Sequence, residues 1–170
     1  FAQQHAHAHA QAFAQAGHTA LATDFSDVAI TKNIERCKNM PRLTFQVVDM
    51  SNPLDMPNAQ FDVVYARLSL HYFTHEVTQR IFASIHKLLQ PKGFFCFVCK
   101  STADPLYGQG VEIEKDMFEN NGHVRHFFSE EYAKALLGKN FEIEKIESGQ
   151  ETFFGRKSAF VKACVPTIIL

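Results

Sequence analysis

Apolar runs of strand length and amphipathic helical stretches alternate along residues 19–98. The strand candidates are residues 19–23, 43–48, 61–66 and 94–98. The helical stretches between them, residues 27–38 and 74–89, place apolar side chains on one face. Because strands that alternate with helices form a doubly wound, mostly parallel sheet, the pattern predicts an α/β architecture. Two further apolar runs, at 141–146 and 158–165, predict a C-terminal antiparallel hairpin.

The length and composition fit one globular domain that spans residues 1–170. With 46% hydrophobic residues the chain can bury one ordinary core, which 17 phenylalanines and no tryptophan make aromatic. The formal net charge of −1 argues against a nucleic-acid groove or a membrane-surface patch and favours a small neutral or mixed-charge ligand. No run of about 18 apolar residues and no signal-peptide pattern is present. We therefore expect a cytoplasmic protein.

Residues 1–16, FAQQHAHAHAQAFAQA, form a leader that is biased toward Ala, Gln and His. The lack of Pro and Gly in it predicts a helix that Gly17 ends. His5 and His9 lie one helical turn apart, but no third ligand with regular spacing lies nearby. A solvated helix is therefore a better interpretation than a metal site, and we predict no metal.

The four cysteines are Cys37, Cys96, Cys99 and Cys164. Cys96 and Cys99 lie within one predicted strand, where their odd spacing points them to opposite faces. This geometry disfavours a redox or zinc pair, and we expect buried free thiols.

Acidic residues follow two of the predicted strands. Asp24 ends the first, where one carboxylate can accept hydrogen bonds from both hydroxyls of a ribose. Its alternative role is to cap the next helix, for which Ser26 is better placed. Asp49 ends the second and can accept from the amine of an adenine on which Met50 packs, or it can form a turn into the loop at residues 51–53. Two acid-tipped strands in succession favour a nucleoside pocket.

Residues 61–73, FDVVYARLSLHYF, are the most specific feature of the chain. A buried strand runs here into a turn that offers a hydroxyl, an imidazole and a phenol before a helix begins near Thr74. Catalytic and ligand-binding groups of open α/β sheets lie at such carboxyl ends of strands. Buried aromatic residues also have packing roles, so a structural and a catalytic role both stay open for His71 and Tyr72.

Periodicity lapses between residues 100 and 122. The segment Tyr107–Gly108–x–Gly110 predicts a mobile connection over the strand ends, which is either a functional lid or a loop. Ser129 then caps a short helix that Gly138 ends.

These features, in this order, resemble class I S-adenosylmethionine-dependent methyltransferases that act on small molecules. The resemblance is carried by Asp24, VVDM at 47–50, FDVVYARLSLHYF at 61–73, LLQPKGFF at 88–95 and the terminal hairpin. It implies a Rossmann-like sheet, S-adenosyl-L-methionine as the cofactor and a small-molecule methyl acceptor, with no nucleic-acid or membrane partner.

The resemblance also implies roles for individual residues. The implied cofactor contacts are Asp24, Phe25, Asp49, Met50, Ala66, Arg67 and Leu68. The ribose would lie at the first of these and the adenine at Asp49 and Met50, while residues 66–68 would flank the methionine part. The implied acceptor-side residues are His71 and Tyr72, with Tyr107 and His126 as lid contacts. His71 is the candidate general base for an acceptor that must lose a proton.

The family begins with a strand and a glycine-rich loop whose backbone approaches the methionine end of the cofactor. The corresponding region here, residues 1–9, contains no glycine, and Gly17 is the only glycine before Gly93. We therefore expect an N-terminally incomplete fold with unpaired strand edges that favour association. A fragment, a truncated gene model and a domain completed by another segment all stay open as explanations, and so does the oligomeric state.

Three functions stay open from the residues alone. The first is the methyltransferase, impaired if the missing loop is needed to bind the cofactor. The second is a nicotinamide-dependent oxidoreductase, which is disfavoured because no glycine fingerprint precedes Asp24 and no Tyr-x-x-x-Lys pair occurs. The third is a non-catalytic α/β module for protein interaction, which the missing loop favours.

Overall fold

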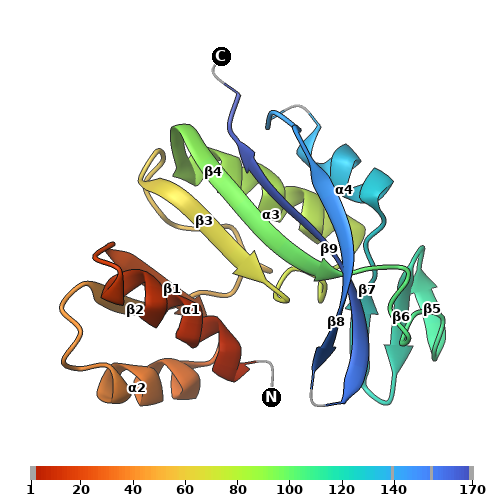
Figure 1. Ribbon diagram of the computed structural model, residues 1–170, viewed down its shortest axis with the longest axis horizontal. Coiled ribbons are helices and arrows are strands. Elements are labelled where there is room, and N and C mark those ends of the chain that lie inside the picture. The colour runs from red at the N-terminus through yellow and green to blue at the C-terminus, as the bar shows by residue number, and fades with distance from the viewer. Residues whose placement is uncertain (1–2, 139, 154, 169–170) are drawn as a thin grey trace. The chain divides into compact units, whose positions relative to one another are not determined.

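The computed structural model describes residues 3–138, 140–153 and 155–168, without the side chains of residues 3–7 and 153 (Figure 1). Residues 1 and 2 of the leader and the side chain of His5 therefore lie outside the described part. The chain divides into two compact units, Phe1–Leu54 (unit 1) and Asp55–Leu170 (unit 2).

Unit 1 pairs helices with a two-stranded parallel sheet. Its elements are α1 (Gln3–Gln15), β1 (Ala20–Asp24), α2 (Asp27–Arg36) and β2 (Leu43–Val47). Gly17, with a φ of +95°, follows α1 as predicted. Ser26 caps α2, because its Oγ accepts a hydrogen bond from the Ala29 N–H at 3.2 Å. A small apolar core is formed by Ala14, Ala22, Cys37 and Leu43.

Unit 2 is built on a four-stranded sheet with the strand order β3-β4-β9-β8 (Figure 1). Its elements are β3 (Phe61–Arg67), α3 (His75–Leu88), β4 (Leu89–Lys100), β5 (Val111–Glu114), β6 (Met117–Asn120), β7 (His123–His126), α4 (Glu130–Leu137), β8 (Ile146–Phe153) and β9 (Arg156–Pro166). β3 and β4 are parallel and α3 is the crossover between them, whereas β9 is antiparallel to both β4 and β8.

Phenylalanines form the core of unit 2, as the composition predicts. Phe95 and Phe97 of β4 pack edge-on against Phe82 of α3, with ring centroids 5.1 and 5.4 Å apart, and all three are at most 1% exposed. Phe94, which precedes Phe95 and lies on the other face of β4, is 44% exposed. One face of the sheet is therefore sealed under helices, and the other is more open.

The segment expected as a mobile connection after residue 100 is largely an antiparallel sheet, β5-β6-β7. Val111 and Ile113 of β5 are 64% and 53% exposed, so this strand lacks the buried alternation that sequence patterns reveal. The turns of the sheet contain Asp116 and Asn121 at φ values of +60° and +52°, conformations that are usually signalled by glycine. The Phe127 N–H donates to the Asp116 carbonyl at 2.8 Å, which ties the first turn to the following chain.

The first strand of the C-terminal hairpin begins later than predicted, at Ile146 instead of residue 141. Phe141 forms an isolated bridge with Thr167 and buries its ring 5.7 Å from that of Phe95, whereas Ile143 is 36% exposed. The apolar run at 141–146 therefore reflects one core anchor and a solvent-facing connection.

Two cysteines correct the expectation of free thiols. Cys96 and Cys164 form a disulfide, while Cys37 and Cys99 are buried free thiols as expected. Sequence spacing could not reveal the pair, because Cys164 faces Cys96 only through the antiparallel register of β4 and β9.

The α/β class and the C-terminal antiparallel hairpin are confirmed. The parallel ladders, β1–β2 and β3–β4, come from the stretch where strands and helices alternate, and the strands after β4 pair antiparallel. Within the ranges described, no helix is both long and apolar enough to cross a membrane.

Candidate functional site

Asp24 and Asp49 lie at the same carboxyl edge of the β1–β2 sheet, as the acid-tipped strands predict. The strands are in parallel register, and the Asp24 carbonyl accepts a hydrogen bond from the Val48 N–H at 2.8 Å. Oδ1 of Asp24 accepts from the Ser26 N–H at 2.9 Å. Ser26 is the cap of α2, so Asp24 does not take the capping role that was its alternative.

Asp49 forms the local turn that the sequence left as its alternative role. Its Oδ1 accepts from the N–H and the hydroxyl of Ser51 at 2.9 and 2.7 Å, and its Oδ2 accepts from the Asn52 amide at 2.9 Å. These bonds, first of all the one from the Ser51 hydroxyl, lower the pKa of the Asp49 carboxyl. Phe25, which follows Asp24, is 70% exposed, and Met50, which follows Asp49, is half-buried. The edge therefore combines two carboxylates with neighbouring apolar side chains.

The end of β3 contains a left-handed residue. Leu68 has a φ of +54° and donates its N–H to the Val98 carbonyl at 2.7 Å. This conformation costs a non-glycine residue about 1–2 kcal/mol, so tertiary contacts must hold it. Just before it, Ala66 is buried and Nη2 of Arg67 lies 3.4 Å from Oε2 of Glu151. The chain leaves the sheet at residues 66–68 in a defined geometry.

His71 is enclosed in unit 2. Its side chain is 1% exposed, and its Nδ1 has no hydrogen-bond partner among the described residues. Burial is the main cause that lowers the pKa of His71 to about 3, and the nearby Lys100 and Arg125 cations lower it further. The ring is therefore neutral at physiological pH. Tyr72, whose ring centroid lies 4.4 Å from that of His71, is 42% exposed.

His126 lies beside His71, and Tyr107 has a different partner. The His126 N–H donates to the His71 carbonyl at 2.9 Å, and Nδ1 of His126 lies 3.3 Å from the Phe73 carbonyl, so this nitrogen carries the proton. Burial lowers the pKa of His126. The Tyr107 hydroxyl donates to Oδ1 of Asp116 at 2.7 Å, and this bond is the main cause that raises the pKa of Tyr107. The structure thus brings His71, Tyr72 and His126 together.

Sequence reasoning missed an ion pair at the end of β4. Nζ of Lys100 lies 2.7 Å from Oδ2 of Asp104 and 3.0 Å from the Ser158 hydroxyl, and the Asp104 side chain is 1% exposed. The spacing of Lys100 and Asp104 along the chain is the one signal that could have suggested the pair. Ser158 reaches it only through the hairpin, so no local pattern predicts its part.

A second unpredicted cluster holds the start of α3. The His75 N–H donates to Oε2 of Glu114 at 2.7 Å, so a carboxylate from β5 lies at the positive end of the helix. The His75 Nδ1 lies 2.9 Å from the Tyr132 hydroxyl, and the Tyr132 ring packs 4.7 Å from that of His126. Burial raises the pKa of Tyr132. This cluster therefore links the β5-β6-β7 sheet, α3 and α4.

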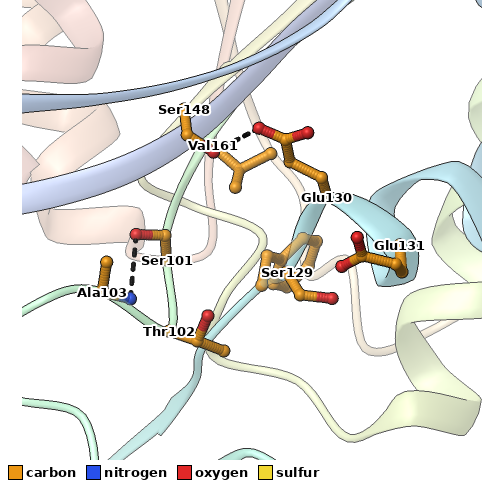
Figure 2. Close-up of a pocket in the computed structure, with 9 residues that line it drawn as sticks. Ser101, Thr102, Ala103, Ser129, Glu130, Glu131, Ser148 and Val161 are labelled. Atoms are coloured by element: carbon orange, nitrogen blue, oxygen red, sulfur yellow. Dashed lines mark hydrogen bonds between the residues drawn. The ribbon is translucent and has the colours of Figure 1, made fainter.

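A hollow of about 250 Å³ lies beside the start of α4 in unit 2 (Figure 2). It is lined by Ser101, Thr102, Ala103, Phe128, Ser129, Glu130, Glu131, Ser148 and Val161. The Ser148 hydroxyl donates to Oε1 of Glu130 at 2.6 Å, and Oγ of Ser101 accepts from the Ala103 N–H at 3.3 Å. None of the site residues that the sequence predicts lines this hollow.

In the part of the chain that the structure describes, no group of three or more His, Cys, Asp or Glu side chains is placed to hold a metal ion.

The fold is shared with solved methyltransferase structures. A SAM-dependent methyltransferase from Methanosarcina mazei superimposes with a TM-score of 0.79 at 18% identity and covers 94% of this chain and 87% of that one. The 1,6-didemethyltoxoflavin-N1-methyltransferase of Burkholderia thailandensis, solved with 1,6-didemethyltoxoflavin and S-adenosylhomocysteine, gives a TM-score of 0.72 at 20% identity over 92% of this chain and 64% of that one. At these identities the likeness shows the fold, which the sequence resemblance predicted as Rossmann-like.

Sequence comparison gives the family. An uncharacterized methyltransferase of Synechocystis is 33% identical over 86 residues, which are 50% of this chain and 38% of that protein, so the matched part spans well under half of the relative's length. Residues 7–93, more than half of this chain, match the family model described as a methyltransferase domain. The chain therefore belongs to the methyltransferase domain family, and its resemblance to class I S-adenosylmethionine-dependent methyltransferases is confirmed.

Proposed function

We propose that this chain acts as a class I S-adenosylmethionine-dependent methyltransferase on a small-molecule acceptor in the cytoplasm. The observation that carries the proposal is the pair of carboxylates, Asp24 and Asp49, at one edge of the β1–β2 sheet inside the segment that matches the family. The Burkholderia enzyme of similar fold was solved with a small molecule and S-adenosylhomocysteine, which supports both the acceptor class and the cofactor.

The nucleoside end of the cofactor fits the described residues of unit 1. A carboxylate has about four acceptor positions, so the local bonds of Asp24 and Asp49 are compatible with ribose hydroxyls at the first and an adenine amine at the second. Phe25 and Met50 would supply apolar surface for the nucleoside. These four residues make up the proposed nucleoside site.

The methionine end of the cofactor fits less completely. The backbone of Ala66, Arg67 and Leu68 is the flank that the family resemblance implies for it, and the left-handed Leu68 fixes the direction of the chain at these residues. The glycine-rich cradle that the family uses has no counterpart in residues 1–16 of this sequence. No residue is therefore assigned to the amine and carboxylate of the cofactor.

When bound, S-adenosylmethionine supplies an activated methyl group, so the protein mainly needs to align the acceptor and exclude water, with effective molarities of about 10⁵ M or more for well-oriented reactants. His71 and Tyr72 are the proposed acceptor-side residues, with Tyr107 and His126 as further substrate contacts. The neutral His71 ring can accept a hydrogen bond at Nδ1.

Isothermal titration with S-adenosylmethionine, and separately with NAD, tests the proposal. We expect heat with the first and none with the second. Asp24→Ala should weaken S-adenosylmethionine binding at least about tenfold, because one charge-assisted hydrogen bond contributes about 1.5–3 kcal/mol. Its Tm should stay near that of the parent.

Asp27→Ala is the matched control, since Asp27 is an exposed acid of the same unit outside the proposed site. It should bind as the parent does. Equal affinity of the Asp24 and Asp27 variants would refute the ribose assignment. A folded parent that gives no heat with either cofactor would instead favour the non-catalytic interaction module.

A further inference from the structure

Cys96 and Cys164 occupy a special register position between β4 and β9. The Thr167 N–H donates to the Gly93 carbonyl at 2.9 Å, and the Ser101 N–H donates to the Ala159 carbonyl at 3.0 Å. In the antiparallel register of these strands, the hydrogen-bonded pairs therefore carry the odd-numbered residues of β4. Cys96 and Cys164 face each other as a non-hydrogen-bonded pair, where side chains approach most closely.

The two sulfur atoms are bonded to each other and lie on the more open face of the sheet. Cys164 is exposed and Cys96 is half-buried, whereas Cys37 and Cys99 are buried. Burial raises the pKa of the Cys99 thiol, which makes it a poor nucleophile. In the described part of the chain, Cys96 and Cys164 are therefore the cysteines that a thiol from solution can reach.

A hollow of about 410 Å³ surrounds the pair and gives it a positive setting. Besides the two cysteines, its lining includes Lys145, Glu147 and Lys162. Nζ of Lys162 lies 3.1 Å from the Glu147 carboxylate, which also pairs with Lys145. Two ammonium groups share one carboxylate, so one positive charge remains to stabilise a thiolate or attract an anionic thiol.

We propose that Cys96 and Cys164 form a reversible dithiol–disulfide site that exchanges with a small anionic thiol of the glutathione type. In oxidation, one protein thiolate attacks glutathione disulfide, forming a mixed disulfide and releasing one glutathione thiolate. The second protein thiolate then attacks the protein sulfur and releases the other. Two electrons pass from the dithiol to glutathione disulfide, the two thiol protons pass to solvent or to the released thiolates, and two glutathione molecules leave.

The reversible disulfide would act on the central strands of unit 2. The disulfide cross-links β4 and β9, the two inner strands of the four-stranded sheet. Oxidation should therefore make this sheet more resistant to unfolding than reduction does.

Equilibration of the full chain in buffers of defined reduced-to-oxidised glutathione ratio, followed by alkylation and peptide mass spectrometry, tests the proposal. We expect Cys96 and Cys164 to pass together from linked to alkylated across the series. Cys99→Ser should leave this transition unchanged. Cys164→Ser should instead trap one glutathionyl group on Cys96, because the resolving thiol is absent.

Three results would overturn the proposal. The pair could stay alkylated at the most oxidising ratio, which would show that the disulfide does not form by exchange. It could also stay linked in excess reduced glutathione while the denatured chain is reduced, which would make it a fixed cross-link. Absence of a glutathione adduct on Cys96 in the Cys164→Ser variant would contradict the proposed exchange step.

Discussion

Replacement of Asp104 by asparagine removes the charge from a heavily bonded side chain of unit 2. The carboxylate accepts hydrogen bonds from Nζ of Lys100 at 2.7 Å and, each at 3.0 Å, from the Ser158 hydroxyl, the Ala159 N–H and the Leu106 N–H. Asparagine keeps the shape but replaces one acceptor oxygen by a donor. At least one of the converging donors then loses its partner.

The expected loss of folding stability follows from the burial of the Lys100–Asp104 pair. Removal of one partner of a buried ion pair costs about 3–5 kcal/mol, because the remaining charge is left uncompensated. The Lys100 side chain is 16% exposed and keeps the Ser158 hydroxyl, so we expect a loss near the lower end, about 3 kcal/mol. Lys100→Met leaves Asp104 with its neutral donors and should cost less, about 1.5–3 kcal/mol. The double variant should cost less than the sum of the two, since the residues are in contact.

Urea unfolding at pH 7, followed by circular dichroism, measures these losses. Glu35→Gln is the control, because the Lys38–Glu35 pair has the same 2.7 Å separation with side chains 62% and 75% exposed. An exposed pair of this kind should change stability by about 0.5 kcal/mol or less. A loss below about 1 kcal/mol for Asp104→Asn, or strict additivity in the double variant, would refute the reasoning.

The same network predicts a pH dependence. Burial acts to raise the pKa of Asp104, but the hydrogen bonds from Lys100 and from the Leu106 and Ala159 N–H groups outweigh it, so the pKa lies below its ordinary value of 3.8. The stabilisation is therefore complete above that value and is lost as the pH falls through the pKa of the folded state. Asp104→Asn should remove this part of the acid-side loss.

Three further predictions concern single side chains. Cys164→Ser should lower stability by about 4 kcal/mol, because the cross-link joins positions 68 residues apart. In urea unfolding, the parent in dithiothreitol should have the same stability as this variant. A midpoint of the variant equal to that of the oxidised parent would contradict the prediction. The parent should lose stability as the pH falls from 6.5 toward about 3, since the folded chain keeps His71 neutral while the unfolded chain protonates it; an equal slope in His71→Gln would exclude that origin. Glu114→Gln should weaken the bond to the His75 N–H by about 1 kcal/mol and speed amide exchange there; unchanged exchange would count against the cap.

The sequence predicted those features whose cause is local. Ser26, Thr74 and Ser129 each accept a bond from the N–H three residues on, which a hydroxyl residue before an amphipathic run can do without help from distant chain. Asp24 and Asp49 could be placed at one edge because consecutive strands joined by a helix run parallel. Their proposed ligand contacts stay predictions.

The features that sequence reasoning missed depend on register between distant segments. Ser158 bonds to Asp104 across 54 positions, and Cys96 meets Cys164 across 68. The β5-β6-β7 sheet was not predicted for another reason. Its strands are four residues long, so periodicity does not mark them, and its first turn reaches positive φ at Asp116 without a glycine. The second turn, Asn121–Gly122, carries a hairpin signal that the interpretation of residues 100–122 as a loop did not use.

The burial of His71 narrows the chemistry that the proposed methyltransferase could perform. A general base works best when its pKa lies near the operating pH, and a pKa of about 3 leaves His71 far below it. A neutral Nδ1 without a partner can still accept a hydrogen bond from the substrate that receives the methyl group. His71 would then orient a group that donates an N–H, such as an amine, more effectively than it would deprotonate an alcohol. The rate of methyl transfer should accordingly show no titration of His71 between about pH 5 and 8. A rate that falls with a pKa near 6.5 in the parent, but not in His71→Gln, would instead show that the ring acts as the base.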